Sequence, residues 1–392
     1  MNATKNLLRS RVGKYSRALV RPVAKLTGNA FPLRADFRGT SQSTVVPHHR
    51  FFGTDAHVNV VHVSVQEARE TTAKALQMIG WDHEDAALQA EIMTAAELCG
   101  NNQGLVKMYQ PALMAPSPNA GKPTVERETP TSAVVNANQS PGMLAAVNAA
   151  DLAVHKATTN GPIAIVTSYN TSTSSGQLAF YVERMARKGI IGIAMANSPE
   201  FVAAAQGGKP VFGTNPIAVG IPQKDAVPFT FDMATSAIAL FGLLTSKAQN
   251  TPLPSNVAYG KDGGWTTDAA EVLDGGAIAT FGGHKGAGLA LCIELLAGAL
   301  SGSAVLGLVE SKKSAKSWGH LFIAIDPNAL TDDFESKTAS VIAAVKASGD
   351  NIRIPGERSA NMSEERKAVG IMPVPQKIWE SIVLTAEHGI QN

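Results

Sequence analysis

Two short polar segments, each set among glycines or other small residues, constrain the fold of this chain more than any other feature. The first, Asp232-Met-Ala-Thr-Ser236, follows an alternation of Phe229 and Phe231 that is typical of a strand. The second, Phe281-Gly-Gly-His-Lys-Gly-Ala-Gly288, begins about fifty residues later and adds the positive charge of Lys285. Backbone N–H groups become available where a strand ends, and glycines let an anion approach the chain closely. The two segments therefore predict the two halves of one cofactor site.

Composition indicates a globular protein with two or three domains and a substantial core. The 392 residues are 44% hydrophobic and 17% charged. Residues 1–50 carry ten Lys or Arg and one Asp, which leaves 24 basic against 31 acidic residues in the remainder and disfavours a nucleic-acid partner. Polar residues and glycines interrupt every apolar run, so we expect no membrane span. With only Cys99 and Cys292 and no clustered histidine motif, we expect neither a disulfide framework nor a metal site.

The N-terminal segment has the composition of a targeting sequence. Residues 1–35 contain eight Lys or Arg and no acidic residue, with apolar side chains between them. This pattern resembles a mitochondrial presequence. A plastid presequence and a basic arm on a cytoplasmic protein are the alternatives. We expect residues 1–57 to form an extension ahead of the folded protein.

Helix-capping signals predict a helical pair at the start of the folded part, near Val58. Ser64-Val-Gln-Glu67 has the spacing of a capping box, which predicts a helix through about Met78 that ends at Gly80. Asp82 is a second N-cap candidate, and the apolar spacing after it predicts a helix to about Leu98.

The middle of the chain alternates helical and strand patterns. Residues 115–142 read as loops with short strands around 133–135, and helical patterns at 145–157 and 177–188 alternate with strand patterns at 163–167 and 190–196. This order indicates a βαβ unit. Later patterns predict strands at 229–232 and 321–325 and a helix at 287–300. Ser172, Ser174 and Ser175 lack a G-x-S-x-G context, so they are expected to cap helix 177–188 or to bind an anion at its start.

Five sequence blocks occur in an order that is typical of one enzyme family. Over residues 62–375, the chain resembles the malate/L-lactate dehydrogenase-like family of nicotinamide-dependent oxidoreductases, which includes ureidoglycolate and sulfolactate dehydrogenases and cyclic imino-acid reductases. The blocks are Asn197-Ser198, Gly213-Thr-Asn-Pro-Ile217, Asp232-Met-Ala-Thr-Ser236, Gly282-Gly-His-Lys-Gly286 and Pro355-Gly-Glu357. The resemblance implies a homodimer that acts on a small carboxylate-bearing substrate.

The resemblance also implies an α/β fold of a particular kind. The NAD(P)-binding domain of the family has a largely antiparallel sheet instead of the doubly wound dinucleotide fold, and a helical domain is built from both chain ends. The lack of a G-x-G-x-x-G segment after a strand agrees with this. The implied organisation is an extension at 1–57, a helical part at 58–142, a cofactor-binding domain at 143–340, and a C-terminal part at 341–392 that returns to the helical domain.

The family pattern assigns a cofactor role to eleven positions, and the cofactor is NAD or NADP. Lys285 suits phosphate, and Asp232 or Thr235 suit ribose or amide groups. Taken one by one, Asp232 could instead cap the next helix, His284 could bond a backbone carbonyl, and Lys285 could be solvated. The full set is Asn197, Ser198, Asp232, Met233, Ala234, Thr235, His284, Lys285, Gly286, Gly356 and Glu357.

The catalytic positions depart from the family pattern. Members usually carry Ser-His-Gly with an arginine four residues after the histidine, whereas this chain has Gln103 and Lys107 at those places. A second family histidine matches the neighbourhood of Thr171, where serines and threonines follow. Reduction of a ketone or imine needs a proton donor, and glutamine cannot exchange a proton. Lys107 as an acid or carboxylate anchor, Tyr169, and a water held by Thr171 remain candidates, beside the reading of Gln103 and Lys107 as an exposed pair.

Together these features predict hydride transfer between a nicotinamide cofactor and a small 2-hydroxy acid, 2-oxo acid or cyclic imino acid. The missing histidines keep one alternative open, a nucleotide-binding or metabolite-sensing protein of the same fold with altered catalysis.

Overall fold

The structure, a computed structural model, is described here for residues 59–101, 103–306, 308–310 and 316–390. The predicted targeting extension at 1–57 and the predicted start at Val58 lie outside these residues. The described part is a mixed α/β protein, as expected. Its main sheet has seven strands in the order β2 (Thr124–Glu128), β3 (Ser132–Asn136), β4 (Ile163–Tyr169), β12 (His320–Ile325), β5 (Ile191–Ala196), β8 (Ile217–Ile221) and β9 (Phe229–Met233).

The main sheet is largely antiparallel, and the βαβ unit predicted from the strand patterns at 163–167 and 190–196 does not form a pair of neighbouring strands, although the preceding strand and β4 do form one. Strands β3 and β4 are parallel neighbours joined by α3 (Gly142–Thr159), whereas β4 and β5, joined through α4 (Ala179–Ala186), are not paired with each other. Strand β12 lies between them and runs antiparallel to both. A strand that arrives more than a hundred residues later cannot be placed from the local alternation of elements.

Small residues allow the helices to pack closely on one face of the main sheet. Gly192 and Gly220 face α4, where a Cβ on Gly192 would meet the Met185 side chain and one on Gly220 would collide with the Val182 carbonyl. The opposite face carries larger side chains that stay partly exposed on β4, β5, β8 and β9. Helices therefore cover one face of the sheet, and the other face carries partly exposed apolar side chains.

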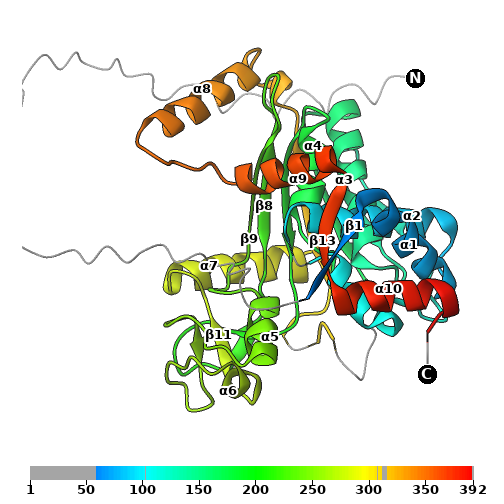
Figure 1. The fold of residues 1–392 in the computed structure, drawn as a ribbon. Helices are drawn as coiled ribbons and strands as arrows, with labels where there is room; N and C mark the ends of the chain where they lie inside the picture. The colour runs from blue at the N-terminus through cyan, green and yellow to red at the C-terminus, as the bar shows by residue number, and fades with distance from the viewer. Residues whose placement is uncertain (1–58, 102, 307, 311–315, 391–392) are drawn as a thin grey trace, which may run out of the picture. The chain divides into compact units, whose positions relative to one another are not determined.

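The two ends of the described chain meet in a two-stranded sheet, with β1 (Val60–Ser64) antiparallel to β13 (Ile371–Pro375) (Figure 1). Helix α1 (Val65–Met78) follows β1, and Ser64 caps it as predicted, with its Oγ accepting from the Glu67 N–H at 3.0 Å. Helix α1 packs against α2 (His83–Leu98) and against α10 (Gln376–His388). The domain boundaries themselves stay a prediction.

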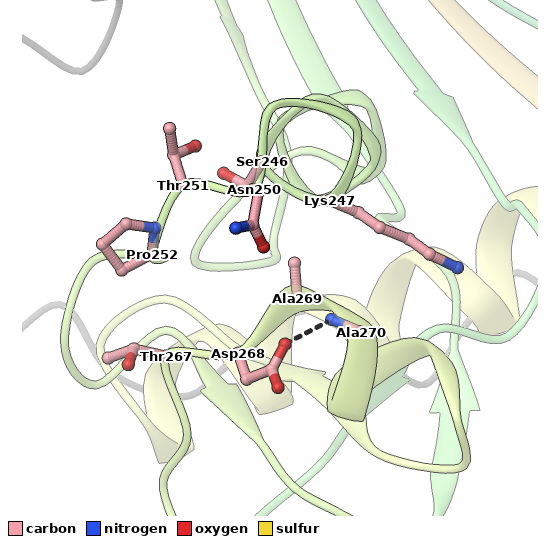
Figure 2. A pocket seen from close by; sticks show the side chains of 9 residues that line it. All are labelled: Ser246, Lys247, Asn250, Thr251, Pro252, Thr267, Asp268, Ala269 and Ala270. Carbon is pink, nitrogen blue, oxygen red and sulfur yellow. Dashed lines mark hydrogen bonds between the residues drawn. The ribbon is translucent and has the colours of Figure 1, made fainter.

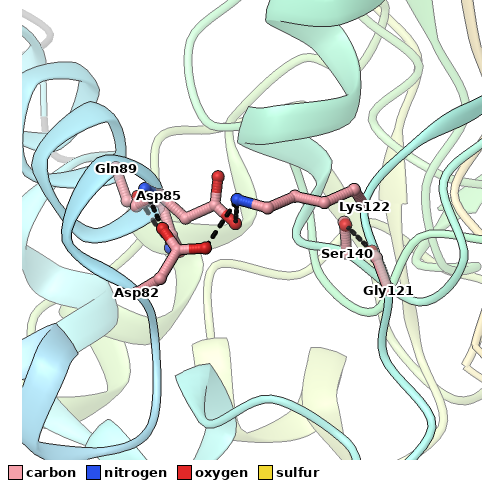
Figure 3. Close-up of polar contacts among 6 residues, drawn as sticks. All are labelled: Asp82, Asp85, Gln89, Gly121, Lys122 and Ser140. Atoms are coloured by element: carbon pink, nitrogen blue, oxygen red, sulfur yellow. Dashed lines mark hydrogen bonds and ion pairs between the residues drawn. The ribbon is translucent and has the colours of Figure 1, made fainter.

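The predicted N-cap of α2 is confirmed, and it also anchors the chain ahead of β2 (Figure 3). Asp82 Oδ1 accepts from the Asp85 N–H at 2.9 Å. Lys122 Nζ lies 2.6 Å from a carboxylate oxygen of each of these aspartates. The capping bond and the neighbouring ammonium both favour the ionised form, so the pKa of Asp82 is lowered.

A smaller sheet has four short strands, which come between strands of the main sheet in the sequence. Its order is β10 (Ala258–Tyr259), β11 (Ala277–Ala279), β6 (Val202–Ala203) and β7 (Pro210–Phe212). Helices α5 (Leu240–Gln249) and α6 (Ala269–Leu273) contact each other next to it. Helix α7 (His284–Ile293) continues directly into a π-helical turn, η3 (Glu294–Ala299), which agrees with the helix predicted over 287–300.

The remaining elements complete the chain. Short 3-10 turns η1 and η2 follow α2, η4 follows β12, and helices α8 and α9 precede β13. Their bounds are Leu105–Tyr109, Pro111–Met114, Pro327–Ala329, Phe334–Ala347 and Glu357–Val369.

Two local predictions are wrong. The stretch 115–142 was predicted as loops with short strands around 133–135; β3 confirms that strand, but β2 was missed, because all five of its residues are exposed and show no apolar alternation. Helix α4 is not capped by Ser172, Ser174 or Ser175, because it begins at Ala179, whose N–H is bonded by a residue of β9. Helices of the described ranges are too short or too polar to cross a membrane.

Candidate active site

A buried carboxylate joins three segments of the predicted cofactor site. Glu294, in η3, accepts from the Asn215 Nδ2 at 2.8 Å and from the Asn197 Nδ2 at 3.4 Å. Both asparagines are fully buried, at 0% exposure. Burial raises the pKa of Glu294, and the two amide donors oppose that rise. The end of β5, the turn before β8 and η3 are thus held together by one side chain.

The two predicted halves of the site are hydrogen-bonded to each other. The Thr235 N–H donates to the Thr214 carbonyl at 2.8 Å, and the Phe281 N–H donates to the Thr235 carbonyl at 3.0 Å. Ser236 and Thr280 form an antiparallel bridge. Thr235 is buried and its hydroxyl donates to the carbonyls of Thr214 and Asn215, so Thr235 fixes the turn after β9.

A glycine turn opens the start of α7. Gly282 and Gly283 have φ values of 56° and 60°, in the left-handed region that glycine adopts without strain. His284 and Lys285 are exposed in the first turn of the helix. Gly286 is buried, and a Cβ there would collide with the Phe281 carbonyl. This arrangement presents backbone N–H groups and a lysine to solvent, which suits an anion.

The residues of 232–234 point in different directions. Asp232 Oδ2 accepts from the Ala179 N–H at 2.8 Å, so it caps α4 instead of the following helix. Enclosure by the surrounding chain raises the pKa of Asp232 to about 6, against the α4 backbone bonds, although part of the side chain stays exposed. Met233 pairs with Ile217 and lies on the opposite face of the sheet. Ala234 follows the strand end and is partly exposed.

The Pro-Gly-Glu block lies against β9. Gly356 has a φ of 81°, and a Cβ there would collide with the Thr230 carbonyl, two residues before Asp232. Glu357 pairs with Lys346 and accepts from the Ile354 N–H at 3.3 Å, and these contacts lower its pKa. The block therefore lies against β9, the strand that leads into the Asp232–Ser236 segment.

Ser198 completes the predicted cofactor set. Its Oγ lies 3.3 Å from the Thr214 Oγ1 and accepts from the Asn215 N–H at 3.4 Å. A Cβ on Gly213 would collide with the Ser198 side chain. Ser198 thus supports the turn that also holds Thr235.

The turn with Gln103 and Lys107 lies against the last turn of α2. A Cβ on Gly104 would collide with the Met93 carbonyl and would sit 2.8 Å from Ala96 Cβ. The Gln103 N–H donates to the Asn101 Oδ1 at 3.0 Å. Gly104 lets the chain approach α2 this closely, and Lys107 follows in η1.

Lys107 contacts the loop that follows β4. Its Nζ donates to the Ser174 Oγ at 2.5 Å and lies 3.5 Å from the Ser174 carbonyl oxygen. Desolvation lowers the pKa of Lys107 to about 8, and the charge of Glu310 opposes that shift. A lysine with this pKa carries a transferable proton near neutral pH.

The structure favours a structural role for Thr171 over the predicted catalytic one. Thr171 is fully buried, its Oγ1 donates to the Trp318 carbonyl at 3.1 Å, and it accepts from the Trp318 N–H at 3.0 Å. Both bonding directions of the hydroxyl are used. The Tyr169 hydroxyl likewise donates to Glu126 Oε2 at 2.7 Å.

The sequence did not predict that Ser174 is the partner of Lys107. It also did not single out two buried titratable side chains, Glu97 and His320. Glu97, in α2, accepts from the Leu105 N–H; burial raises its pKa to about 7, against that bond and the charge of Arg366. His320 is fully buried with its Nδ1 3.1 Å from the Ser168 Oγ, and burial lowers its pKa to about 4. Glu97 lies six residues before Gln103, which was a usable signal, whereas nothing local marks His320.

A separate polar groove of about 290 Å³ lies between α5 and α6 (Figure 2). Its lining comes from residues 246–252 and 267–270, ranges that contain none of the predicted site residues. Asp268 points its carboxylate to the Ala270 N–H at 2.8 Å and caps the short helix α6. The groove is therefore distinct from the candidate site.

The sequence and the fold are both similar to those of known dehydrogenases and reductases. The model of the malate/L-lactate dehydrogenase family matches residues 63–383. Malate/(S)-sulfolactate dehydrogenase of Methanothermus fervidus is 33% identical over 336 residues, which cover 83% of this chain and 97% of that protein. Delta(1)-pyrroline-2-carboxylate reductase 1 of Burkholderia ambifaria is 34% identical over 269 residues, 67% of this chain and 77% of that protein. The structure of malate dehydrogenase from Pyrococcus horikoshii is 29% identical, with a TM-score of 0.75, and covers 86% of this chain and 99% of that one.

This chain belongs to the malate/L-lactate dehydrogenase family. It is accordingly an NAD(P)-dependent dehydrogenase or reductase by class.

Proposed function

We propose that this protein interconverts a small 2-hydroxy acid and its 2-oxo acid, or reduces a cyclic imino acid, with NAD or NADP as cofactor. One observation carries the proposal: the turn after β9 and the glycine turn before α7 are hydrogen-bonded into one unit through Thr235 and Phe281. Relatives named for malate, sulfolactate and pyrroline-2-carboxylate agree with the substrate class. Their substrates share a carboxylate beside the carbon that changes oxidation state.

The residues present fit a nicotinamide cofactor. The open glycine turn, the α7 N–H groups and Lys285 suit its phosphates, because backbone donors, helix dipole and charge act on one side. Ala234 directly follows β9, the Gly356–Glu357 segment lies against β9, and both would contact the remaining parts of the cofactor. When bound, the cofactor supplies or accepts the hydride. We place this binding in a family-specific domain at 143–340, with 58–142 and 341–392 forming the helical domain.

On the substrate side, we assign the proton to Lys107. Gln103 can donate a hydrogen bond to a carbonyl oxygen but has no proton to exchange. Lys107 has a pKa of about 8, so its ammonium form dominates at neutral pH and its amine form appears slightly above it. The pair thus divides the work of the missing histidine between polarisation and proton transfer.

A fluorescence titration with NADH and NADPH tests the cofactor site. We expect Lys285→Ala to weaken binding about tenfold or more, since it removes a phosphate partner. Lys261→Ala is the matched control, because Lys261 is an exposed lysine in a surface ion pair with Asp274. Wild-type protein is then offered 2-oxo acids and cyclic imines. Tight cofactor binding without turnover would favour the sensing alternative, and absence of binding would refute the site.

We further propose a homodimer formed through the open face of the main sheet. Ile163 and Ile165 on β4 are 47% and 39% exposed, and partly exposed isoleucines continue across β5 and β8. Leu291 on α7, Leu295 on η3 and Leu300 just after η3 are also exposed. Contiguous apolar surface of this extent is unusual on a monomer. Light scattering should give a dimer mass that Ile165→Glu reduces to the monomer, and a monomeric wild type at micromolar concentration would refute the interface.

Residues 1–57 are proposed to direct the protein to mitochondria, with plastid and cytoplasmic locations as alternatives. Eight basic and no acidic residues in 1–35 support this. A fluorescent reporter fused after residue 57 should reach mitochondria, and a diffuse signal would contradict the assignment.

A further inference from the structure

The Lys107–Ser174 contact joins the two places where this chain lacks a family histidine. Lys107 lies four residues after Gln103, and Ser174 lies in the loop between β4 and α4. Their side chains meet at 2.5 Å between Nζ and Oγ. Gly176, with a φ of 78°, keeps this contact open: a Cβ there would lie 3.3 Å from the Gln103 carbonyl oxygen and 3.9 Å from Lys107 Cε. The hydroxyl, the ammonium and the Gln103 turn are therefore neighbours.

The loop fixes Ser174 from both sides. The Thr173 carbonyl accepts from the Gly142 N–H at 3.1 Å, at the start of α3. The Ser175 carbonyl accepts from the buried Tyr181 hydroxyl at 2.6 Å. A hydroxyl held by bonded neighbours on either side keeps one position, and a fixed position is what a proton-transfer group needs.

The chemistry of a hydroxyl suits a relay. A serine Oγ accepts hydrogen bonds through two lone pairs and donates one proton. With Lys107 Nζ–H occupying one lone pair, the Oγ–H is directed to another acceptor. Lys107 is partly buried, and its Nζ–H already points at Ser174 Oγ, so the hydroxyl is placed to receive its proton.

We propose that Ser174 is a catalytic residue whose hydroxyl passes the proton between Lys107 and the reacting oxygen or nitrogen of the substrate. The inference rests on the proposed function. In the reducing direction, the substrate carbon gains hydride and its oxygen or nitrogen takes the proton from Ser174 Oγ. The O–H bond of Ser174 breaks, and a Lys107 N–H proton restores it, which leaves a neutral amine. In the oxidising direction, each proton moves the opposite way and Lys107 ends as the ammonium.

Ser174→Ala tests the relay in the full-length protein, with Thr173→Val as the control that removes the adjacent hydroxyl. For Ser174→Ala we expect kcat to fall by about 10²–10³, the range of general acid–base catalysis, with cofactor affinity by fluorescence unchanged. For Thr173→Val we expect kcat within about threefold of wild type, because Thr173 Oγ1 makes only a 3.3 Å contact to the Ser174 carbonyl. Ser174→Thr, which keeps the hydroxyl, should recover part of the loss.

A proton inventory separates a relay from a structural role. In mixed H₂O and D₂O the inventory should be curved for wild type, since two protons move, and linear for the alanine variant. A linear inventory in wild type would contradict the relay.

The outcomes distinguish the two proposals. Turnover by wild type with an unchanged kcat in Ser174→Ala, or a change confined to KM, would overturn the relay alone. Loss of cofactor binding in Ser174→Ala would also overturn it, because the hydroxyl would then serve the fold. If wild type binds cofactor but turns over no substrate of the panel, the proposed function and the relay both fail.

Discussion

Glu294→Ala is the perturbation that most directly tests how the cofactor site is held together. Glu294 is 5% exposed and is bonded by the buried amides of Asn215 and Asn197. Removing it takes away a strong bond at 2.8 Å and a weak one at 3.4 Å, while each amide keeps a backbone acceptor, Ala290 at 3.2 Å and Ala304 at 2.9 Å. The substitution therefore removes the bonds to Glu294, while both amides keep one hydrogen bond each.

The magnitude follows from those contacts. Loss of one good hydrogen bond to a charged acceptor costs about 1.5–3 kcal/mol. The weak bond adds little, and release of a buried carboxylate, whose pKa is raised by burial, returns part of the cost. We therefore expect Glu294→Ala to lower the free energy of unfolding by about 2 kcal/mol, which for a chain of this size corresponds to roughly 4 °C in Tm.

The same change should weaken cofactor binding. Asn215 lies in the turn whose carbonyls accept the Thr235 hydroxyl, so a looser Asn215 leaves the turn after β9 less ordered. Cofactor binding would then have to order this turn. If ordering the turn costs about 1.4 kcal/mol of binding free energy, the Kd becomes about tenfold weaker. Glu294→Gln keeps the shape and an amide oxygen for Asn215, and it should retain most of both quantities.

Urea unfolding and NADH or NADPH fluorescence titration measure the two effects on the same preparations. Glu364→Ala is the matched control, because Glu364 makes only an exposed pair with Lys367 on α9 and should change stability by at most about 0.5 kcal/mol. A Glu294→Ala protein as stable as this control, with unchanged cofactor affinity, would refute the reasoning.

Two further predictions follow from buried groups of the site. Folded Glu97 has a pKa of about 7 against an ordinary 4.5, so the folded state binds the Glu97 proton more tightly, and the free energy of unfolding falls as pH rises from 4.5 through 7. In urea unfolding, Glu97→Gln should match the wild-type stability near pH 4.5 and exceed it by up to about 3 kcal/mol at pH 8. Equal pH dependence of stability in both proteins would contradict this. Gly286→Ala should weaken cofactor binding about tenfold or more in fluorescence titrations, because the new Cβ would displace the Phe281 carbonyl and the glycine turn. Gly288→Ala is the control and should leave cofactor affinity unchanged, because there is open space around its Cβ. Equal cofactor affinities of the two variants would count against a role for the glycine turn.

Local signals predicted the helical pair and several strands because the responsible contacts lie close in sequence. Ser64 and Asp82 cap the helices that their spacing predicts, three residues before the N–H groups that they bond. Strand β2 escaped detection because its side chains are all exposed, and β12 could be predicted as a strand but not placed between β4 and β5. Placement depends on long-range pairing that short windows do not contain.

The site could be predicted as a set of segments, but the work of individual residues could not. Asp232 was expected to bind cofactor or to cap the helix that follows, yet it caps α4, which begins fifty-three residues earlier in the sequence. Thr171 was expected near the chemistry, and its hydroxyl is used by Trp318. When a side chain has two plausible partners, only the distances in the folded structure decide which partner it bonds. Sequence patterns can therefore indicate which segments form a candidate site without indicating what each residue does.

The replacement of the family histidine raises the question of which groups would do its work, and the proposed function divides that work between two side chains. A histidine combines hydrogen bonding, proton exchange and a pKa near neutrality in one ring. Under the proposed function, Gln103 would retain only the hydrogen bond, and Lys107, whose pKa desolvation lowers to about 8, would exchange the proton near neutral pH. The loop serine that contacts Lys107 at 2.5 Å would then bring that proton within reach of substrate. If this division is correct, restoring histidine at 103 alone should not raise activity, because Lys107 and Ser174 would still occupy the proton-transfer position.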